Sequence, residues 1–402
     1  MRDYISRLVN ADSRLVAGIM SGTSLDGVDT VIARITGSGR GMSFDVLAFR
    51  FQSYSAALRA DLMRQSTSDT SDVREISQLN VRLAHEYARA VDLLLEEEGM
   101  GRDELDLVGS HGQTIHHVPV PERCAGELVS STLQIGDPSV LANLLGVPVV
   151  GDFRLADMAH GGQGAPLVPY FDYVFFCDDE LTRGLLNLGG IANLTVLPAG
   201  GAAGEVTAFD TGPANILIDL VAEQLFERPY DENGELATAG TVDDNLLADL
   251  LTQDAYLSKP PPKSTGRELY GALYARAIID AGVERGLSSH DIIATTSALT
   301  AASIYQAYAR FIRDRHTLDE VIVSGGGRRN GFLMHRLQES FAPIHVRPID
   351  AFGIDTDAKE ALCFAVLAHE TMSGVPTGMP SVTGAGESAI LGKICIPARN
   401  TL

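Results

Sequence analysis

The fold of this chain is decided by residues 18–29, which read Gly18-Ile19-Met20-Ser21-Gly22-Thr23-Ser24-Leu25-Asp26-Gly27-Val28-Asp29. An apolar run precedes this stretch, and residues 30–35 alternate after it as a β-strand does. A turn rich in Gly, Ser and Thr directs main-chain N–H groups toward one point, and such a nest favours anions such as phosphate. Its spacing fits neither of the common nucleotide-binding loops, G-x-x-x-x-G-K-[ST] and G-x-G-x-x-G. It therefore predicts a β-hairpin whose tip cradles phosphate, the alternative being an ordinary hairpin turn.

The chain has 402 residues, which is enough for two domains with full cores. Its net charge is −21 and it has no long Lys/Arg run, which argues against nucleic acid and anionic membranes as partners. The four cysteines stand far apart without metal-ligand spacing, so reduced thiols are expected. No apolar run reaches the roughly 18 residues that span a bilayer, and the N-terminus lacks the apolar core of a secretion signal. These features predict a cytoplasmic protein.

Strands alternate with helices along the chain, which predicts an α/β layered fold. Further strands are expected near residues 44–49, 105–110, 147–150, 206–209, 320–324 and 389–391. Helices are expected near residues 71–99, 216–226, 269–285, 294–314 and 332–341, with two more ending at 145 and 372. His116 and His117 are expected in a loop, and residues 161–166 in the passage between domains. Residues 228–268 are polar and irregular, which predicts a long loop. Structureless loops this long are uncommon in compact domains, so we expect this one to be functional.

Two further glycine turns follow the first. Residues 183–197 repeat the opening pattern, because a strand runs into Asn187-Leu188-Gly189-Gly190 and out into a second strand. We interpret this as an internal duplication that gives each of two domains one hairpin, with the hairpins facing each other across a cleft. The third turn, Gly325-Gly326-Gly327, opens a helix after a strand, and glycines there allow a flat ring or a phosphate close to the backbone.

Three glycine turns of these types, in this order, resemble those of the superfamily of sugar kinases, actin and heat-shock chaperone ATPases. More narrowly, the chain resembles the anhydro-N-acetylmuramic acid kinase family in ten ordered stretches: MSGTSLDGVD, SHGQT, LQIGD, GDFR, GGQGAPLVP, NLGGIAN, FDTGP, KSTGRE, SGGGRRN and DAKEA. The resemblance implies an α/β, two-domain actin-like ATPase (ribonuclease H-like) fold with an interdomain active-site cleft. It also implies one lobe of residues 1–155 plus 385–402, a second lobe of residues 156–384, and a homodimer.

The resemblance further implies the reaction. In this family ATP and water convert 1,6-anhydro-N-acetylmuramic acid to N-acetylmuramic acid 6-phosphate in cell-wall (peptidoglycan) recycling. Water opens the anhydro bridge at the anomeric carbon, and the freed O6 takes the γ-phosphate. The expected cofactors are ATP and Mg²⁺, and the expected partner is an amino sugar. The alternatives are another superfamily sugar or acyl kinase that hydrolyses no ring, and a nucleotide-driven chaperone or filament protein.

In the superfamily the first two turns clamp the ATP phosphates, and the third lies against the adenosine. The resemblance therefore implies an ATP site made of Gly22, Thr23, Ser24, Leu25, Asp26, Gly27, Val28, Asp29, Gly189, Gly190, Asn193, Gly325, Gly326 and Gly327. Within this set, Asp26 is the carboxylate expected to hold Mg²⁺ through water.

Ring opening needs a base that deprotonates water, and the candidates at strand ends are Asp26, Asp152 and Asp210. Asp152 could position a sugar hydroxyl or orient Arg154. The resemblance places the family's catalytic aspartate at Asp210 of FDTGP, for which the alternative is a helix N-cap or an Asx turn. It also places Glu360 near Asp210 and the attacking water, the alternative being an exposed Glu favoured by the helix dipole.

Further substrate contacts are expected from SHGQT, which supplies His111, Gln113 and Thr114. A structural role is the alternative for His111. Arg154 suits the lactyl carboxylate of the sugar or a phosphate, because its planar fork binds either, and a buried pair with Asp152 is its alternative.

One position departs from the family pattern, because Ala214 stands where the family usually has a glycine after FDTGP. Alanine is strained there if the residue needs a positive φ, and it fits well if it begins a helix. Lys263 and Arg267, in the long loop, are expected either to reach phosphates or to lie solvated on the surface.

Overall fold

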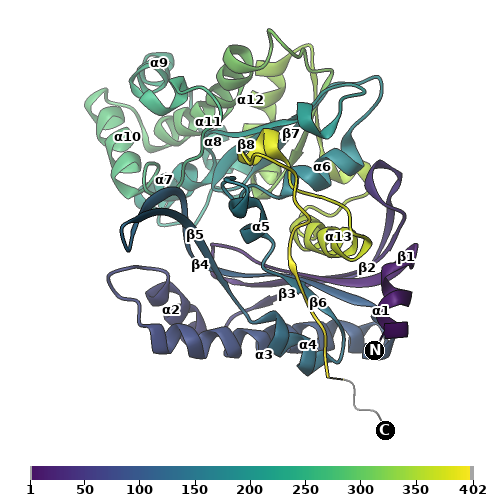
Figure 1. Cartoon of the computed structure of the whole chain (residues 1–402). Helices are drawn as coiled ribbons and strands as arrows, with labels where there is room; N and C mark the ends of the chain where they lie inside the picture. Colours follow the sequence, from purple (N-terminus) through teal and green to yellow (C-terminus); the bar gives the residue numbers. More distant parts are fainter. Residues whose placement is uncertain (1, 399–402) are drawn as a thin grey trace. The chain divides into compact units, whose positions relative to one another are not determined.

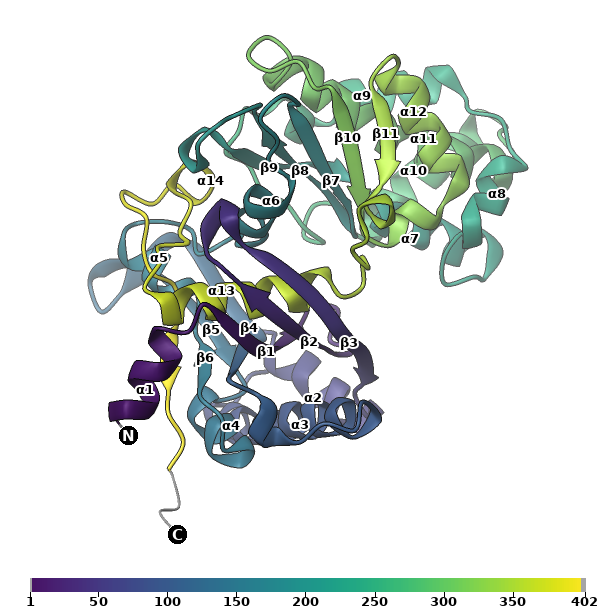
Figure 2. The same cartoon turned by 90° about the vertical axis from the view of Figure 1, so that its right-hand side faces the viewer.

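The computed structural model describes residues 2–398, and the chain folds into two compact units (Figures 1 and 2). Unit 1 comprises Met1–Phe175 and Asp357–Leu402, and unit 2 comprises Phe176–Thr356. Unit 2 is therefore one insertion between two segments of unit 1. The lobe boundaries expected from the sequence, after residues 155 and 384, remain a prediction.

Unit 1 is built on a mixed sheet, and the α/β class predicted from the sequence is confirmed. Its strands, among the described residues, run in the order β12-β6-β4-β1-β2-β3, with β5 added to β4. Helix α13 packs on one face of this sheet and α3 on the other (Figure 2). The strands are β1 (Ser13–Ser21), β2 (Gly27–Thr36), β3 (Ser43–Ser53), β4 (Leu107–Cys124), β5 (Glu127–Ile135), β6 (Val149–Gly151) and β12 (Lys393–Cys395). The helices are α1 (Arg2–Val9), α2 (Ala56–Gln65), α3 (Val73–Glu97), α4 (Pro138–Leu145), α5 (Arg154–Ala159), α6 (Val168–Phe176), α13 (Lys359–Ser373) and α14 (Pro380–Thr383).

Helix α13 lies unusually close to the two strands at the centre of this sheet. A Cβ added to Gly18 of β1 would stand 2.0 Å from the carbonyl oxygen of Ala361, and one added to Gly109 of β4 would stand 2.1 Å from that of Phe364. Both contacts are with helix backbone, which cannot move aside as a side chain can. Glycine at these two strand positions therefore sets the depth at which α13 is seated.

Unit 2 has a second sheet, with the order β11-β10-β7-β8-β9 among the described strands. Strands β7, β10 and β11 are parallel, whereas β7-β8-β9 form an antiparallel meander. The strands are β7 (Arg183–Leu188), β8 (Ile191–Leu197), β9 (Thr207–Pro213), β10 (Glu320–Ser324) and β11 (His345–Pro348). The helices are α7 (Asn215–Phe226), α8 (Glu235–Thr238), α9 (Asp244–Gln253), α10 (Ala272–Glu284), α11 (Ser289–Phe311) and α12 (Gly331–Phe341). Helix α11 packs against β8 and β9, and most of its residues are buried.

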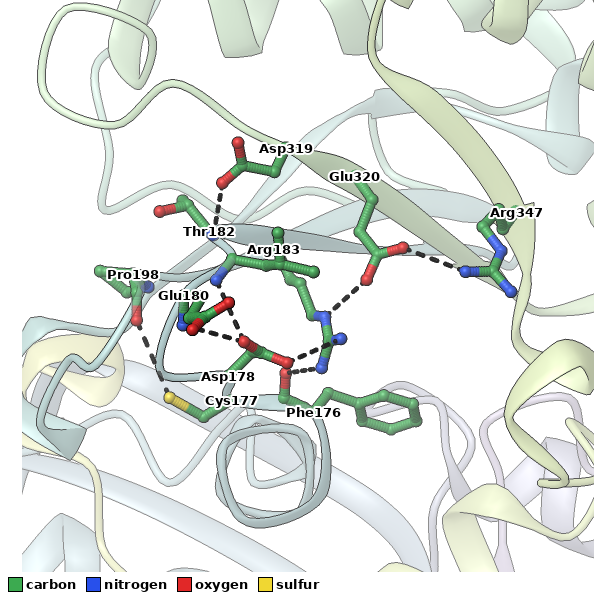
Figure 3. A network of polar contacts seen from close by, with 11 residues as sticks. Phe176, Cys177, Asp178, Glu180, Thr182, Arg183, Pro198, Asp319, Glu320 and Arg347 are labelled. Carbon is green, nitrogen blue, oxygen red and sulfur yellow. Dashed lines mark hydrogen bonds and ion pairs between the residues drawn. The ribbon is translucent and has the colours of Figure 1, made fainter.

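A polar network joins the three parallel strands of unit 2 through Arg183 and Glu320, which begin β7 and β10, and Arg347 of β11 (Figure 3). Arg183, at the start of β7, donates from Nε to Glu320 Oε1 at 2.6 Å and pairs through Nη2 with Asp178 Oδ2 at 3.0 Å. The other carboxylate oxygen of Glu320 contacts Arg347 Nη1 of β11 at 3.4 Å. Glu320 is 7% exposed, so the network is only weakly screened by solvent. It holds the register of the strands whose opposite ends carry the second and third glycine turns.

Several expected elements differ from the structure. His116 and His117 lie in β4, not in a loop, because β4 continues past the sheet and pairs with β5 as a two-stranded ribbon. Proline has no N–H to donate to a neighbouring strand, and the register shift between Val118 and Glu122 accommodates Pro119 and Pro121 in this ribbon.

Two further expectations were wrong. Residues 228–268 are not a long loop, because they contain α8 and α9, and the side chain of Asp243 caps α9 by accepting from Leu246 N. The expected strand at 389–391 is instead β12, which begins at Lys393 after Gly392, a residue with a φ of +93°. Helix α1 and strands β5 and β11 had no expected counterpart. Among residues 2–398, no helix is long and apolar enough to cross a membrane.

We expect Gly18→Ala to lower the free energy of unfolding by about 1–3 kcal/mol, because the added methyl group must push α13 off the sheet. Urea unfolding followed by circular dichroism measures this, since the chain has no Trp. Gly41→Ala is the control, because an added Cβ there meets nothing within 4 Å, and its effect should stay within about 0.5 kcal/mol. Equal effects of the two substitutions would contradict the close approach of α13.

Glu320→Ala should destabilise unit 2 by about 1–3 kcal/mol, because it leaves the half-buried Arg183 short of a charged partner. The readout is hydrogen exchange of the β7 and β10 amides. Glu339→Ala is the matched control, since Glu339 pairs with Arg336 at 3.0 Å on an exposed helix face, where such pairs contribute about 0–1 kcal/mol. Unchanged exchange in β7 and β10 of the Glu320 variant would rule out this role of the network.

Candidate functional site

The first glycine turn is the hairpin between β1 and β2 in unit 1, as predicted. Gln113 holds it from the neighbouring strand, accepting from Ser21 Oγ at 2.5 Å and donating to the carbonyl of Gly22 at 3.0 Å. Tyr54 adds a hydrogen bond to the Ser21 hydroxyl at 2.7 Å. Gln113 is fully buried, so its amide supports the turn and leaves Thr23 and Ser24 at the exposed tip.

Carboxylates gather beside this turn. Asp26 is exposed and accepts from Ser24 Oγ at 2.6 Å. Burial, together with the charges of Glu360 and Asp26, raises the pKa of Asp29 to about 7. Glu360 lies in the first turn of α13, and its carboxylate reaches solvent. Desolvation by the surrounding protein raises the pKa of Glu360, while the charges of Lys359 and Arg154 oppose this shift. Three carboxylates, of Asp26, Asp29 and Glu360, are therefore close enough at the first turn to affect one another's charge.

Arg154 lies on α5 and is oriented by His111 of β4. Its Nη2 and Nε stand 2.8 Å and 3.1 Å from Nε2 of His111, and its Nη1 donates to the carbonyl of Gly164 at 2.7 Å. Because arginine only donates, Nε2 of His111 is the acceptor. Burial and the Arg154 charge lower the pKa of His111 to about 3, so the ring is neutral near pH 7. His111 therefore serves as a fixed acceptor for Arg154.

The side chains of Asp152 and Thr114 contact protein groups other than Arg154. The carboxylate of Asp152 pairs with Lys393 of β12 at 2.8 Å, whereas Arg154 contacts His111, so the buried Asp152–Arg154 pair considered from the sequence does not form. Asp152 has a φ of +56°, in the left-handed region that Asp adopts more readily than most residues. Thr114 Oγ1 accepts from Gln134 of β5 at 3.2 Å.

The second glycine turn, Gly189–Gly190 in unit 2, is fixed by the start of α7. The N–H of Asn215 donates to the Gly189 carbonyl at 3.1 Å, and the N–H groups of Ala214 and Ile216 donate to the Gly190 carbonyl at 3.0 and 3.1 Å. Ala214 has a φ of −129°, so alanine in place of the family's usual glycine meets no positive-φ strain.

The third glycine turn packs against the second. Gly325 has a φ of +82°, and a Cβ there would stand 2.6 Å from the carbonyl oxygen of Leu188, at the end of β7. Asn215 Nδ2 donates to that same carbonyl at 2.9 Å. The ends of β7 and β10 thus bring Gly189–Gly190 and Gly325–Gly327 side by side at the carboxyl edge of the parallel strands, the usual ligand edge of an α/β sheet.

Beside the second turn, unit 2 has a cavity of about 620 Å³. It is lined by Gly189, Gly190, Asn215, Ile216, Asp219, Leu220, Glu223, Arg267, Gly271 and Ala272. Burial and the nearby charge of Asp231 raise the pKa of Asp219 to about 6. The lining therefore combines a glycine turn with the acidic side chains of Asp219 and Glu223 and the basic side chain of Arg267.

Asp210 of β9 stands close to the second hairpin, within unit 2. Its Oδ1 accepts from Asn193 Nδ2 of β8 at 2.9 Å. Its Oδ2 accepts from Ser264 Oγ at 2.9 Å and from the N–H of Thr265 at 3.0 Å. Asp210 is therefore neither a helix cap nor part of an isolated turn, because its carboxylate is held by two separate segments.

Comparison with known proteins assigns the family. The family model for anhydro-N-acetylmuramic acid kinase matches residues 14–397. The chain belongs to this family. It is 53% identical over 396 residues to the anhydro-N-acetylmuramic acid kinase of Salinibacter ruber, covering 98% of this chain and 99% of that protein. It is 44% identical over 383 residues to the enzyme of the same name from Gloeobacter violaceus, covering 95% and 99%.

Among solved structures, the chain is similar to component A of (R)-2-hydroxyglutaryl-CoA dehydratase from Acidaminococcus fermentans. The TM-score is 0.45 at 12% identity, with 90% of this chain and 100% of that chain covered. Membership of the kinase family makes this protein an enzyme, a phosphotransferase with an alcohol group as acceptor.

The predicted residues of this kinase fall into two groups. Unit 1 contains the first turn, Asp152, Arg154 and Glu360, and unit 2 contains Asp210 with the second and third turns. The proximity of Glu360 to Asp210 remains a prediction. Sequence reasoning missed that Ser264 and Thr265 hold Asp210, although KSTGRE was among the stretches that carried the family resemblance.

Protonation of Asp29 should make stability depend on pH. Its pKa in the folded protein is about 7, above its ordinary value, so the folded state holds this proton more tightly than the unfolded state does. The free energy of unfolding should therefore fall as pH rises from about 4 to about 7, by about 2 kcal/mol or less after solvent screening.

Asp29→Asn should remove this part of the dependence in urea unfolding between pH 5.5 and pH 7.5. Asp61→Asn, on the exposed face of α2, is the control and should keep it. A wild-type slope retained in Asp29→Asn would show that other groups cause the pH dependence.

Proposed function

We propose that this family member uses ATP and water to convert 1,6-anhydro-N-acetylmuramic acid to N-acetylmuramic acid 6-phosphate, as a cytoplasmic homodimer in cell-wall recycling. Family membership supports the substrate, since the relatives carry that name. One observation supports the hydrolytic part above all. Asp210 is a carboxylate fixed by three hydrogen-bond donors and still has an unused acceptor position.

Asp210 is the general base of the proposed reaction. Water loses a proton to its carboxylate, and the water oxygen bonds to the anomeric carbon. The bond from this carbon to O6 breaks, and O6 keeps the electron pair. The freed O6 attacks the γ-phosphorus, the bond to the β-phosphate oxygen breaks, and ADP leaves. Base catalysis of this kind is worth about 10²–10⁴ in rate. Glu360 is proposed to assist near the same water.

The glycine turns are the proposed phosphate and nucleoside contacts. Main-chain N–H groups at such turns favour anions, whereas the carboxylates of Asp219 and Glu223 repel them. We therefore assign the phosphates to the Gly189–Gly190 turn of the cavity in unit 2, which Arg267 also lines, and the ribose hydroxyls to the carboxylates of Asp219 and Glu223. Gly325–Gly327, beside this cavity, is proposed to lie against the adenosine.

Mg²⁺ is the proposed metal, and the residues of the first turn fit it. Burial, and after it the charges of Glu360 and Asp26, raise the pKa of Asp29, so a bound cation would favour its charged form, and carboxylate oxygens are the ligands that Mg²⁺ prefers. Among residues 2–398 no three metal-ligating side chains converge, so Asp26 and Asp29 would hold the ion through water together with the phosphates. When bound, the ion neutralises charge on the transferring phosphoryl group.

Arg154 is the proposed contact for the lactyl carboxylate of the sugar. Its guanidinium is oriented by His111 and Gly164, and its remaining N–H groups suit a carboxylate. The sugar contacts expected of His111, Gln113, Thr114 and Asp152 remain predictions, since the structure engages these side chains with other protein groups.

We expect Asp210→Asn to reduce turnover of the anhydro sugar by about 10²–10⁴-fold while leaving ATP affinity unchanged, because only the base is lost. Steady-state kinetics and calorimetric ATP binding provide the two readouts. Asp249→Asn, which alters an exposed pair with Arg285, is the control. Near-normal turnover in Asp210→Asn would mean that another group takes the proton.

Isotope labelling separates this function from its nearest rival. In ¹⁸O-water, the proposed reaction places the label on the anomeric oxygen of the product. A kinase that phosphorylates a hydroxyl or carboxylate without ring hydrolysis leaves the anomeric oxygen unlabelled.

A further inference from the structure

The carboxylate of Asp210 is held unequally at its two oxygens. Oδ2 accepts two hydrogen bonds, from Ser264 Oγ at 2.9 Å and from Thr265 N at 3.0 Å. Oδ1 accepts one, from Asn193 Nδ2 at 2.9 Å. Each carboxylate oxygen has two lone pairs. The protein therefore fills both acceptor positions of Oδ2 and leaves one open on Oδ1.

We propose that Ser264 and Thr265 form a strap that positions Asp210 so that Oδ1, and not Oδ2, receives the proton of the attacking water. This inference rests on the proposed function of Asp210 as the base. Ser264 and Thr265 are positioning residues in this scheme, because they act through Asp210.

The strap is itself anchored on the main chain of Asp210. The Asp210 N–H donates to the carbonyl of Lys263 at 3.1 Å, and the hydroxyl of Tyr256 donates to the Asp210 carbonyl at 3.0 Å. The backbone and the side chain of Asp210 are thus fixed by the same segment. A carboxylate fixed in this way keeps its orientation toward the water without reorganising during the reaction.

Lys263 fixes the start of the strap to the apolar core of unit 2. Its ammonium lies over the rings of Tyr256 at 4.6 Å and Phe311 at 5.2 Å, and it donates to the Tyr256 carbonyl at 3.3 Å. Burial lowers the pKa of Lys263 to about 8, with the charges of Asp254 and Asp210 opposing the shift. These contacts direct Lys263 to the aromatic rings, so it anchors the segment that carries Ser264.

The two donors of the strap differ in kind. Thr265 contributes a main-chain N–H, which only a substitution by proline removes, whereas Ser264 contributes a hydroxyl from an exposed residue. Loss of the hydroxyl alone opens one acceptor position on Oδ2 and leaves the backbone of the strap in place. Ser264 is therefore the residue at which the proposal can be tested without disturbing the fold.

The kinetic test compares Ser264→Ala with Ser264→Thr and with the control Ser258→Ala, an exposed serine that contacts Arg310. Ser264→Ala should lower kcat for the anhydro sugar by about tenfold with KM for ATP unchanged, since one hydrogen bond to the base is lost. The acid limb of its pH profile should move to higher pH, because a carboxylate that loses a donor is protonated more easily. Ser264→Thr should restore both, and Ser258→Ala should behave as wild type.

Two outcomes would overturn the proposal. One is a pH profile and kcat of Ser264→Ala within twofold of wild type. The other is an equal loss in Ser258→Ala, which would indicate a general effect on the segment. In a crystal with the anhydro sugar and a non-hydrolysed ATP analogue, a water on Oδ1 supports the assignment, and a water on Oδ2 contradicts it.

A spectroscopic titration keeps this test separate from the proposed function. With ¹³C-labelled aspartate carboxyls, the Asp210 signal is assigned by its loss in Asp210→Asn. Its titration midpoint should rise by about 0.5–1 pH unit in Ser264→Ala and not in Ser258→Ala. If wild type fails to consume the sugar but this shift is found, the proposed function fails and the strap stands. If wild type is active and no shift occurs, the strap fails alone.

Discussion

The close approach of helix α13 to the sheet is the constraint on which unit 1 depends. Gly18 and Gly109 let the helix backbone touch the two central strands, and this contact sets where Lys359 and Glu360 stand relative to the first glycine turn. Lys359 is held from the other side by a buried pair with Asp172 of α6 at 2.6 Å. A helix seated this deeply cannot slide by a residue without a backbone collision.

Unit 2 holds the carboxylate of Asp210 and the second and third glycine turns on neighbouring strands of one sheet. The Arg183–Glu320 network fixes the starts of β7 and β10, and the first amides of α7 fix the turn that follows β7. Asp210 is held from β8 and from the segment around Ser264. Each group is rigid because its hydrogen bonds are satisfied within the same unit, which is the condition for preorganised chemistry.

Local patterns predicted the hairpins and the strand–helix alternation, because these follow from short stretches of sequence. The roles of Asp210 and Glu360 were inferred from the family resemblance and remain predictions. What escaped prediction depends on long-range contacts. Nothing local to Gln113 shows that its amide is used by Ser21 and Gly22, and nothing near Ser264 shows that it returns to Asp210. Helix α9 was not predicted, although Asp243 precedes leucines at helical spacing, because residues 228–268 as a whole are polar.

The insertion of unit 2 into unit 1 affects the order in which the chain can fold as it is made. Unit 2 is one continuous segment, and all of it is synthesised before α13 and β12. Until then the face of the unit 1 sheet that carries Gly18 and Gly109 has no helix to cover it, and β6 lacks its neighbour. While unit 2 is being made, the nascent chain therefore carries an uncovered apolar face and an unpaired strand edge, and such surfaces are prone to aggregation.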